Sequence, residues 1–347
     1  GFFKILQPAR FGGYEMDVET FYDVQMKVAE GCMSSAWVLG VVAVHNWQLA
    51  LFAPQEQDDV WAQDATTLIS SSYMPKAQVT RVDGGFRISG RWGFSSGVDH
   101  CQWAFLGGLV ADPETGIPDF WTFLVPRQDF IVHHCWNTIG LGGTGSHDVE
   151  VKDAFVPAHR THRSKDGFAS TNPGAQSNPG PLYKLPFGQV FVRAVSSSSI
   201  GALQGALDHF VANGAKRKSN NTGASSAGDP DVQVLIAETQ SAIDEMKCVL
   251  MRNFAVLNEK ARAGEQADIE TRLRFRLQSA QIAGRCGELI SRMYHLGGAD
   301  GISRGNVIAR TFCDIHTGRT HVANNPNSVG RNFGNVMLGG DNADSFI

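Results

Sequence analysis

The chain has 347 residues, of which only 18% are charged, with a net charge of −4 and 38 glycines. Average proteins are about 25% charged and about 7% glycine, so this chain is poor in charge and rich in glycine. The slight acidity argues against nucleic acid as the main partner, because binding to phosphates needs a basic face. No apolar run is long enough to span a membrane, and the six scattered cysteines contain no CxxC pair. We therefore expect a cytoplasmic protein that does not bind membranes.

Hydrophobic periodicity divides the chain into regions. Residues 1–65 predict helices, and residues 66–165 predict a β-domain of about seven short strands, in which Leu68–Tyr73 and Gln78–Val82 form separate runs. That number of strands suits a small barrel or sandwich. The next stretch, 166–188, is rich in Ser, Asn, Pro and Gly, which is typical of a linker or an ordered loop.

From residue 189 to 347 the helical period returns, and it predicts long helices packed as a four-helix bundle, followed by a tail. The predicted fold class is therefore α+β, with helices on both sides of the β-domain. A hairpin turn is expected at Asp83-Gly84-Gly85, because Asp and Gly favour the left-handed backbone that such turns need.

Three glycines at 140, 142 and 145 have the GxGxxG spacing of a dinucleotide-binding loop. In such a loop the motif leaves a strand and opens a helix. Here residues 146–152 alternate as a strand does, so the sequence predicts a glycine-rich turn between two strands. No Gly-Lys-Ser/Thr follows, which excludes a phosphate-binding P-loop.

Candidate metal ligands are sparse. His133 and His134 are adjacent, so on a strand they would point to opposite faces. His159 and His162 have no third and fourth ligand close by in the sequence. We therefore predict no metal site.

His45 lies in the otherwise apolar stretch Val38–Phe52. A buried imidazole needs hydrogen-bond partners for its nitrogens, and it can act as an acid or base near neutral pH. A satisfied core histidine is the alternative interpretation. Lys216 and Arg217 end a predicted helix, where they could form a phosphate clamp or simply a solvated helix end.

Two glycine-containing segments resemble the acyl-CoA dehydrogenase fold. Residues 142–146 (GGTGS), with the strand pattern that follows as far as Pro157, are similar to the β-domain signature of that fold. Residues 88–97 (ISGRWGFSSG) are similar to its flavin-contacting strand. The order of helices, β-domain and helical bundle also agrees with this fold.

Four further segments resemble the oxygenase components of two-component flavin-dependent aromatic hydroxylases, including those that act on a phenolic secosteroid and on 4-hydroxyphenylacetate. These segments are Val44–Phe52, Ile69–Tyr73, Trp92–His100 and Asp314–His321. The resemblance covers essentially the whole chain. A helical segment that precedes residue 1 in the family has no counterpart here, so we expect the N-terminal helical domain to be truncated.

The resemblance implies a flavin-dependent monooxygenase. Reduced flavin, with FMN as first choice and FAD as second, would arrive from a separate NAD(P)H:flavin reductase. Its C4a-hydroperoxide, formed with O₂, would ortho-hydroxylate a phenolic substrate. Members of the family are tetramers, so a homotetramer is expected, and it would also account for the low surface charge.

The resemblance further implies roles for residues on the substrate side. His45 and Ser71 would hold the substrate hydroxyl, with His45 favouring the phenolate. Trp37 would line the pocket. His321 would assist formation or protonation of the flavin peroxide.

On the flavin side, Ser96 would form a hydrogen bond near N5. Phe94 would pack on the flavin ring, and Ser95 would support the same strand. Lys216 and Arg217 could hold the flavin phosphate.

Two other functions remain open: an acyl-CoA dehydrogenase-like oxidase or dehydrogenase, and a non-catalytic member of the family. Acyl-CoA dehydrogenases take a proton with a glutamate, either in the C-terminal segment or on an earlier helix. Residues 168–207 and 315–340 contain neither Asp nor Glu. Proton abstraction from a thioester would therefore lack its base.

Overall fold

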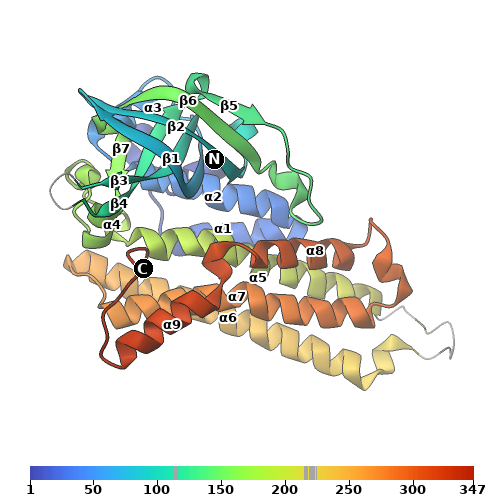
Figure 1. The fold of residues 1–347 in the computed structure, drawn as a ribbon. Helices are drawn as coiled ribbons and strands as arrows, with labels where there is room; N and C mark the ends of the chain where they lie inside the picture. The colour runs from blue at the N-terminus through green and yellow to red at the C-terminus, as the bar shows by residue number, and fades with distance from the viewer. Residues whose placement is uncertain (113–115, 215–217, 219–222, 224) are drawn as a thin grey trace.

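Helices occupy both ends of the chain, and a seven-stranded sheet occupies its middle (Figure 1). The computed structural model describes residues 1–112, 116–214, 218, 223 and 225–347. The helices are α1 (Val18–Gly31), α2 (Met33–Leu49), α3 (Pro54–Trp61), α4 (Ser164–Ala169), α5 (Phe187–Gly214), α6 (Pro230–Ala263), α7 (Ile269–Leu296), α8 (Val307–Arg319) and α9 (Pro326–Met337). The strands are β1 (Ile69–Val82), β2 (Gly85–Ser95), β3 (Trp103–Ala111), β4 (Pro118–Pro126), β5 (Phe130–His133), β6 (His147–Pro157) and β7 (Thr161–Arg163).

The sheet has the strand order β5-β6-β2-β1-β3-β4-β7, in which β1 and β3 are parallel and the other neighbours are antiparallel. The two runs predicted as separate strands, 68–73 and 78–82, are one strand, β1. Its first part pairs with β3 and its last part with β2, with an irregular register between Ser72 and Ala77. Pro75 lies in that interval and has no N–H to donate, so the sequence pattern breaks although the strand continues.

Both glycine-rich segments form turns, as predicted. Val82 and Gly85 are paired at the end of the β1–β2 hairpin, and Gly84 has a φ of +74°. The GxGxxG segment forms a short 3-10 turn at Gly142–Thr144, and strand β6 follows it instead of a helix.

Helix α2 lies beneath the sheet and above the long helices (Figure 1). Nearly all of its side chains are buried, which explains why the sequence is apolar around the whole helix. Trp37 and His45 are eight residues apart on α2, a rise of about 12 Å along its axis. The helix therefore extends under the sheet from one candidate site residue to the other.

The long helices α5, α6 and α7 pack below α1 and α2. The ends of α6 follow local sequence signals, because Asp229 caps its N-terminus ahead of Pro230 and Gly264 ends it with a φ of +75°. The stretch 166–188 is ordered; it contains most of α4, two 3-10 turns and the first residues of α5.

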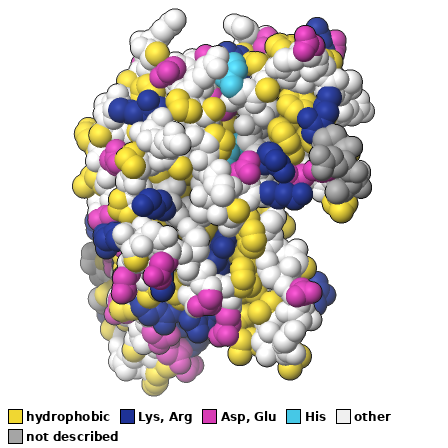
Figure 2. Space-filling model, turned by 90° about the vertical axis from the view of Figure 1, so that its left-hand side faces the viewer, with side chains coloured by type: hydrophobic (Ala, Val, Ile, Leu, Met, Phe, Trp, Pro, Cys, Tyr) yellow, Lys and Arg dark blue, Asp and Glu magenta, His cyan; other side chains and the backbone are white. Residues whose placement is uncertain are grey.

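Charged side chains of both signs are interspersed over the face shown in Figure 2. In the part of the chain that the structure describes, no helix combines the length and the apolar character that crossing a membrane requires.

Two glycines of α5 allow α1 to pack closely against it. A Cβ on Gly201 would lie 2.0 Å from the carbonyl oxygen of Met26, and one on Gly205 would lie 2.1 Å from that of Glu30. Both atoms are helix backbone, which cannot move aside as the tip of a side chain can.

We expect Gly201→Ala to lower the free energy of unfolding by about 1–3 kcal/mol, because α1 must shift away from α5. Gly334→Ala is the matched control: Gly334 lies within α9 with nothing close to its Cβ position, so alanine should be neutral or stabilising by up to about 1 kcal/mol. Urea unfolding of both variants checks this. Equal effects of the two substitutions would contradict the close contact.

Candidate active site

His45 connects α2 to the first strand of the sheet. Its Nδ1 lies 2.6 Å from the carbonyl oxygen of Ile69, and the side chain is fully buried. A carbonyl can only accept, so Nδ1 carries the proton and Nε2 holds a free lone pair. No hydrogen-bond partner reaches Nε2 from the described residues. Burial lowers the pKa of His45 to about 4, so the ring is neutral at pH 7 and presents a buried acceptor.

Aromatic rings surround the imidazole of His45. The rings of Tyr73, Phe105 and Phe191 have centroids 5.8–6.5 Å from that of His45. Ser71 is two residues from Tyr73 on β1, so the two side chains share one face of the strand. The structure thus brings His45 and Ser71, the two residues predicted to hold a substrate hydroxyl, onto adjoining elements beside an aromatic wall.

His321 has the opposite proton arrangement. It caps the short 3-10 helix Val322–Asn324, where its Nδ1 accepts a hydrogen bond from the N–H of Ala323 at 3.1 Å. The neutral ring must therefore carry its proton on Nε2, which makes Nε2 a donor. Loss of solvation, assisted by the positive charge of Arg276, lowers the pKa of His321 to about 4.

Trp37 joins His321 to the end of strand β2. Its ring lies edge-on to His321 with centroids 5.7 Å apart, and its Nε1 donates to Oγ of Ser96 at 3.3 Å. Ser96 also contacts Oγ of Ser146 at 2.7 Å. Three of the predicted site residues, from three distant parts of the sequence, therefore meet at one place.

Phe94 is strained and exposed. Its φ is +63°, in the left-handed region that non-glycine residues rarely occupy, and 67% of the residue is accessible to solvent. Its ring lies edge-on to that of Trp136, with centroids 6.1 Å apart. A large apolar side chain held outward at a conformational cost is typical of a ligand-contacting position. Its neighbour Ser95 is fully buried in β2 opposite His147 and does not share this exposure.

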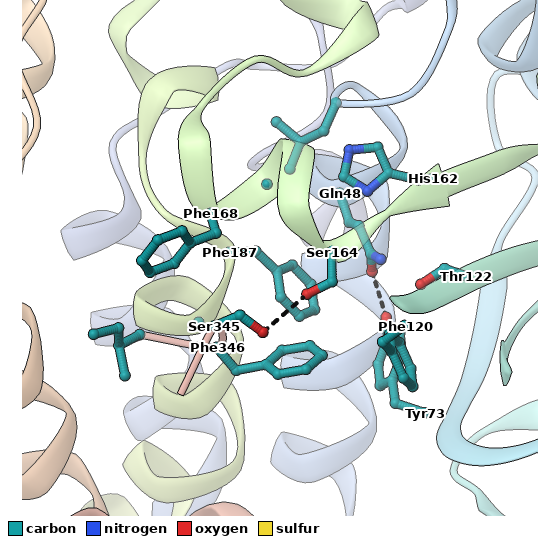
Figure 3. Close-up of a pocket in the computed structure, with 14 residues that line it drawn as sticks. Gln48, Tyr73, Phe120, Thr122, His162, Ser164, Phe168, Phe187, Ser345 and Phe346 are labelled. Carbon is teal, nitrogen blue, oxygen red and sulfur yellow. Dashed lines mark hydrogen bonds between the residues drawn. The ribbon is translucent and has the colours of Figure 1, made fainter. Parts of the chain in front are cut away.

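A small cavity lies next to Tyr73 (Figure 3). Tyr73, which contacts His45, also lines this cavity and donates its hydroxyl proton to Gln48. The rings of Phe187 and Phe346 form part of its wall, with centroids 6.3 Å apart. Its volume is about 20 Å³, which accommodates roughly one water molecule.

Comparisons with known proteins show which family this chain resembles. A family model described as "Acyl-CoA dehydrogenase, C-terminal domain" matches residues 194–326. The flavin-dependent monooxygenase, oxygenase subunit HsaA, of Rhodococcus jostii (strain RHA1) is 39% identical over 349 residues, covering 100% of this chain and 91% of the relative. The FADH(2)-dependent resorcinol hydroxylase, oxygenase component, of Rhizobium sp. (strain MTP-10005) is 30% identical, covering 98% of this chain and 85% of the relative.

The crystal structure of 3-HSA hydroxylase from Rhodococcus sp. RHA1 has a TM-score of 0.95 against this chain at 39% identity, covering 100% of this chain and 89% of that one. The chain belongs to the flavin-dependent monooxygenase oxygenase subunits. The predicted acyl-CoA dehydrogenase fold and the predicted enzyme class are confirmed. Dehydrogenation and a non-catalytic role, the two alternatives, are not what these relatives indicate.

Two candidate residues of this oxygenase subunit, Lys216 and Arg217, lie outside the described residues. Four side chains that sequence reasoning did not assign to the site adjoin its candidate residues: Gln48, Tyr73, Thr144 and Ser146. Tyr73 lies in Ile69–Tyr73, one of the segments that resemble the aromatic hydroxylases, but an aromatic ring alone predicts no role in the site. Thr144 and Ser146 lie in the glycine-rich segment that was explained as a turn.

One group in the described part of this oxygenase subunit has the spacing of metal ligands: Asp99, His134 and His147. The N–H of Trp136 donates to Nδ1 of His147 at 3.2 Å. A neutral His147 therefore carries its proton on Nε2, where a metal would need a lone pair. As arranged, that nitrogen is a donor towards Asp99, 3.4 Å away. The absence of a metal site stays a prediction.

The low pKa of His45 predicts a pH-dependent stability. The unfolded pKa is about 6.5 and the folded pKa is about 4, so the unfolded chain binds more protons in this range. The stabilisation is therefore complete above about pH 6.5 and is lost as the pH falls towards about 4. For one such group the loss between about pH 7.5 and pH 5 is about 2 kcal/mol.

We expect His45→Asn, which keeps a donor for Ile69 but cannot titrate, to reduce this acid-induced loss by about 2 kcal/mol relative to the parent protein. Urea unfolding at the two pH values measures it. The matched control is His295→Asn at an exposed position, which should leave the pH dependence unchanged. An identical pH dependence in the parent protein and His45→Asn would contradict the buried, neutral His45.

Proposed function

We propose that this protein uses reduced flavin and O₂ to hydroxylate a phenolic ring at the carbon next to its hydroxyl. The observation that carries the proposal is the pair of neutral histidines with opposite tautomers. His45 presents a free acceptor at Nε2, and His321 presents a donor at Nε2. A site that must take a proton from one partner and give one to another needs such a pair.

On the substrate side, a phenol hydroxyl would donate a hydrogen bond to Nε2 of His45, which would take the proton as the ring carbon attacks the oxygen atom. Removal of that proton raises the electron density of the ring and makes its ortho carbon nucleophilic. Ser71 would form a hydrogen bond to the phenol oxygen and so orient it. The rings of Phe105, Phe191 and Tyr73 would pack against the aromatic substrate.

On the flavin side, three side chains support a position for the isoalloxazine ring next to the end of β2. Phe94 would offer an exposed aromatic face to the flavin ring, and the hydroxyl of Ser96 would bind N5. Nε1–H of Trp37 donates a hydrogen bond to that hydroxyl and holds it in position. Bound reduced flavin supplies, with O₂, an electrophilic oxygen atom. Ser95 would hold the strand in place through its pairing with His147.

The donor of His321 would serve the oxygen chemistry. Its Nε2–H can hydrogen-bond to a negatively charged oxygen and supply a proton to it, and the ring is held next to Trp37 by a 5.7 Å edge contact. The complete burial of His45 would also keep water from the substrate side, which protects a reactive oxygen species from loss as hydrogen peroxide.

The names of the relatives support the choice of flavin and of a reductase partner. The Rhizobium relative is named as FADH(2)-dependent, so FAD is to be tested beside FMN, our first choice from the sequence. Both relatives are named as oxygenase subunits or components, which supports a separate NAD(P)H:flavin reductase as partner. We also propose a homotetramer, which would cover exposed apolar side chains such as Val322, Met337 and Leu338.

The cavity beside Tyr73 bears on the size of the substrate. Its aromatic wall fits an apolar substituent, but its volume of about 20 Å³ holds no ring. A phenol with a large apolar group would therefore displace Phe346 and the residues around it. We propose a larger apolar phenol as the substrate class because residues 44–52 resemble those of hydroxylases that act on a phenolic secosteroid, and the cavity would have to widen to admit it.

The proposal predicts hydroxylated product from phenols supplied with reduced flavin in the absence of any reductase. The measurement compares catechol product with hydrogen peroxide for a series of phenols of increasing apolar size, with FMN and with FAD. Apolar phenols larger than 4-hydroxyphenylacetate should give the highest ratio of product to peroxide. Peroxide alone from every phenol, or product only from small carboxylated phenols, would contradict the proposal.

A further inference from the structure

We infer that Thr144 and Ser146 form a one-way hydrogen-bond chain that fixes Ser96 as an acceptor, and that the enzyme thereby selects reduced over oxidised flavin. The two hydroxyls are positioning residues that act through Ser96. The inference rests on the proposed placement of flavin N5 at Ser96. It assigns to the GGTGS segment a function beyond that of a turn.

The chain of hydroxyls begins at a backbone carbonyl. Oγ1 of Thr144 lies 2.9 Å from the carbonyl oxygen of Leu141, Oγ of Ser146 lies 2.6 Å from Oγ1 of Thr144, and Oγ of Ser96 lies 2.7 Å from Oγ of Ser146. All three hydroxyl-bearing residues are buried, so water does not compete for these contacts.

The direction of the protons follows from the carbonyl. It cannot donate, so Thr144 donates to it. Since each hydroxyl has one proton, Ser146 must then donate to Thr144, and Ser96 must donate to Ser146. Only this direction satisfies every contact in the chain. Nε1–H of Trp37 approaches Ser96 as a further donor, at 3.3 Å.

Ser96 therefore has no proton left for a ligand, but it keeps a lone pair. Reduced flavin carries a hydrogen on N5 and can donate to that lone pair. Oxidised flavin has no hydrogen on N5 and presents a lone pair of its own, which would face the lone pair of Ser96. The same contact thus favours one redox state and disfavours the other.

The loop from Leu141 to Ser146, which carries the hydrogen-bond chain, is fixed by hydrogen bonds to its neighbours. Oδ1 of the buried Asp314 accepts from the N–H of Leu141 at 2.5 Å, and the N–H of Gly97 donates to the carbonyl oxygen of Thr144 at 2.9 Å. Leu141 adopts a φ of +54°, a strained value for a leucine. These contacts connect α8 to the end of β2 through the loop, so the hydroxyls cannot drift apart.

The test measures binding of each redox state and needs no turnover. Dissociation constants of reduced and oxidised flavin, as FMN and as FAD, are measured without oxygen for the parent protein and for Thr144→Val, which is isosteric but has no hydroxyl. The parent should prefer reduced flavin. In Thr144→Val the protons of Ser146 and Ser96 can reverse, so the preference should fall about tenfold.

Three further variants make the result specific. Ser146→Ala breaks the chain at its middle and should lower the preference by a similar factor. Thr144→Ser restores a hydroxyl and should restore the preference. Ser72→Ala is the matched control, because it removes a buried hydroxyl that donates to the carbonyl oxygen of Gly93 at 2.7 Å but lies outside the chain. It should leave the preference unchanged.

The outcomes distinguish failure of the hydrogen-bond chain from failure of the proposed placement of flavin N5 at Ser96. If Ser96→Ala abolishes the preference while Thr144→Val and Ser146→Ala keep it, the hydrogen-bond chain is refuted and the flavin site stands. If Thr144→Val weakens both redox states equally, the threonine is merely structural and the inference is overturned. If Ser96→Ala changes nothing, N5 does not bind at Ser96, and the proposed flavin placement fails together with the inference.

Discussion

The hydrogen bond from Nδ1 of His45 to the carbonyl oxygen of Ile69 is the interaction on which the substrate side of the site depends. It connects a helix that is buried on all sides to the central strand pairing of the sheet. The bond also decides which nitrogen of His45 holds the proton. Without it, neither the position nor the tautomer of the ring would be defined, and the buried acceptor at Nε2 would not exist.

A second constraint acts on the flavin side. The segment from Leu141 to Ser146 is bound to α8 through Asp314 and to the end of β2 through Gly97. Helix α2 spans the distance between the two sides, with Trp37 at one and His45 at the other. The oxygen chemistry and the phenol can therefore be held in a fixed relation by one rigid, buried element.

The sequence predicted the order of helices and strands because their periodicities are strong, and it predicted the turn at Gly84 because few other residues tolerate its backbone. It did not predict that β1 is continuous, since Pro75 interrupts the local pattern while the pairing partners come from elsewhere in the chain. His45 was recognisable as a polar residue in an apolar stretch.

The tautomer of His45 was not recognisable, because it is set by Ile69, 24 residues away. The tautomer of His321 was not recognisable either, because it is set by the hydrogen bond with which the ring caps a 3-10 helix. The hydroxyl of Thr144 was missed because its segment could be interpreted as a turn alone. Identities of side chains are visible in a sequence, whereas the direction of a proton along a hydrogen-bond chain is a property of the folded arrangement.

The most direct test of opposite proton roles is rapid mixing of the reduced-flavin complex with O₂ in His45→Ala and in His321→Ala, with the transient absorbance phase and the hydroxylated product followed together. The account predicts that His45→Ala keeps the absorbance phase and loses the product, whereas His321→Ala loses or slows the phase itself. Loss of the phase in His45→Ala, with an unaltered phase in His321→Ala, would contradict it.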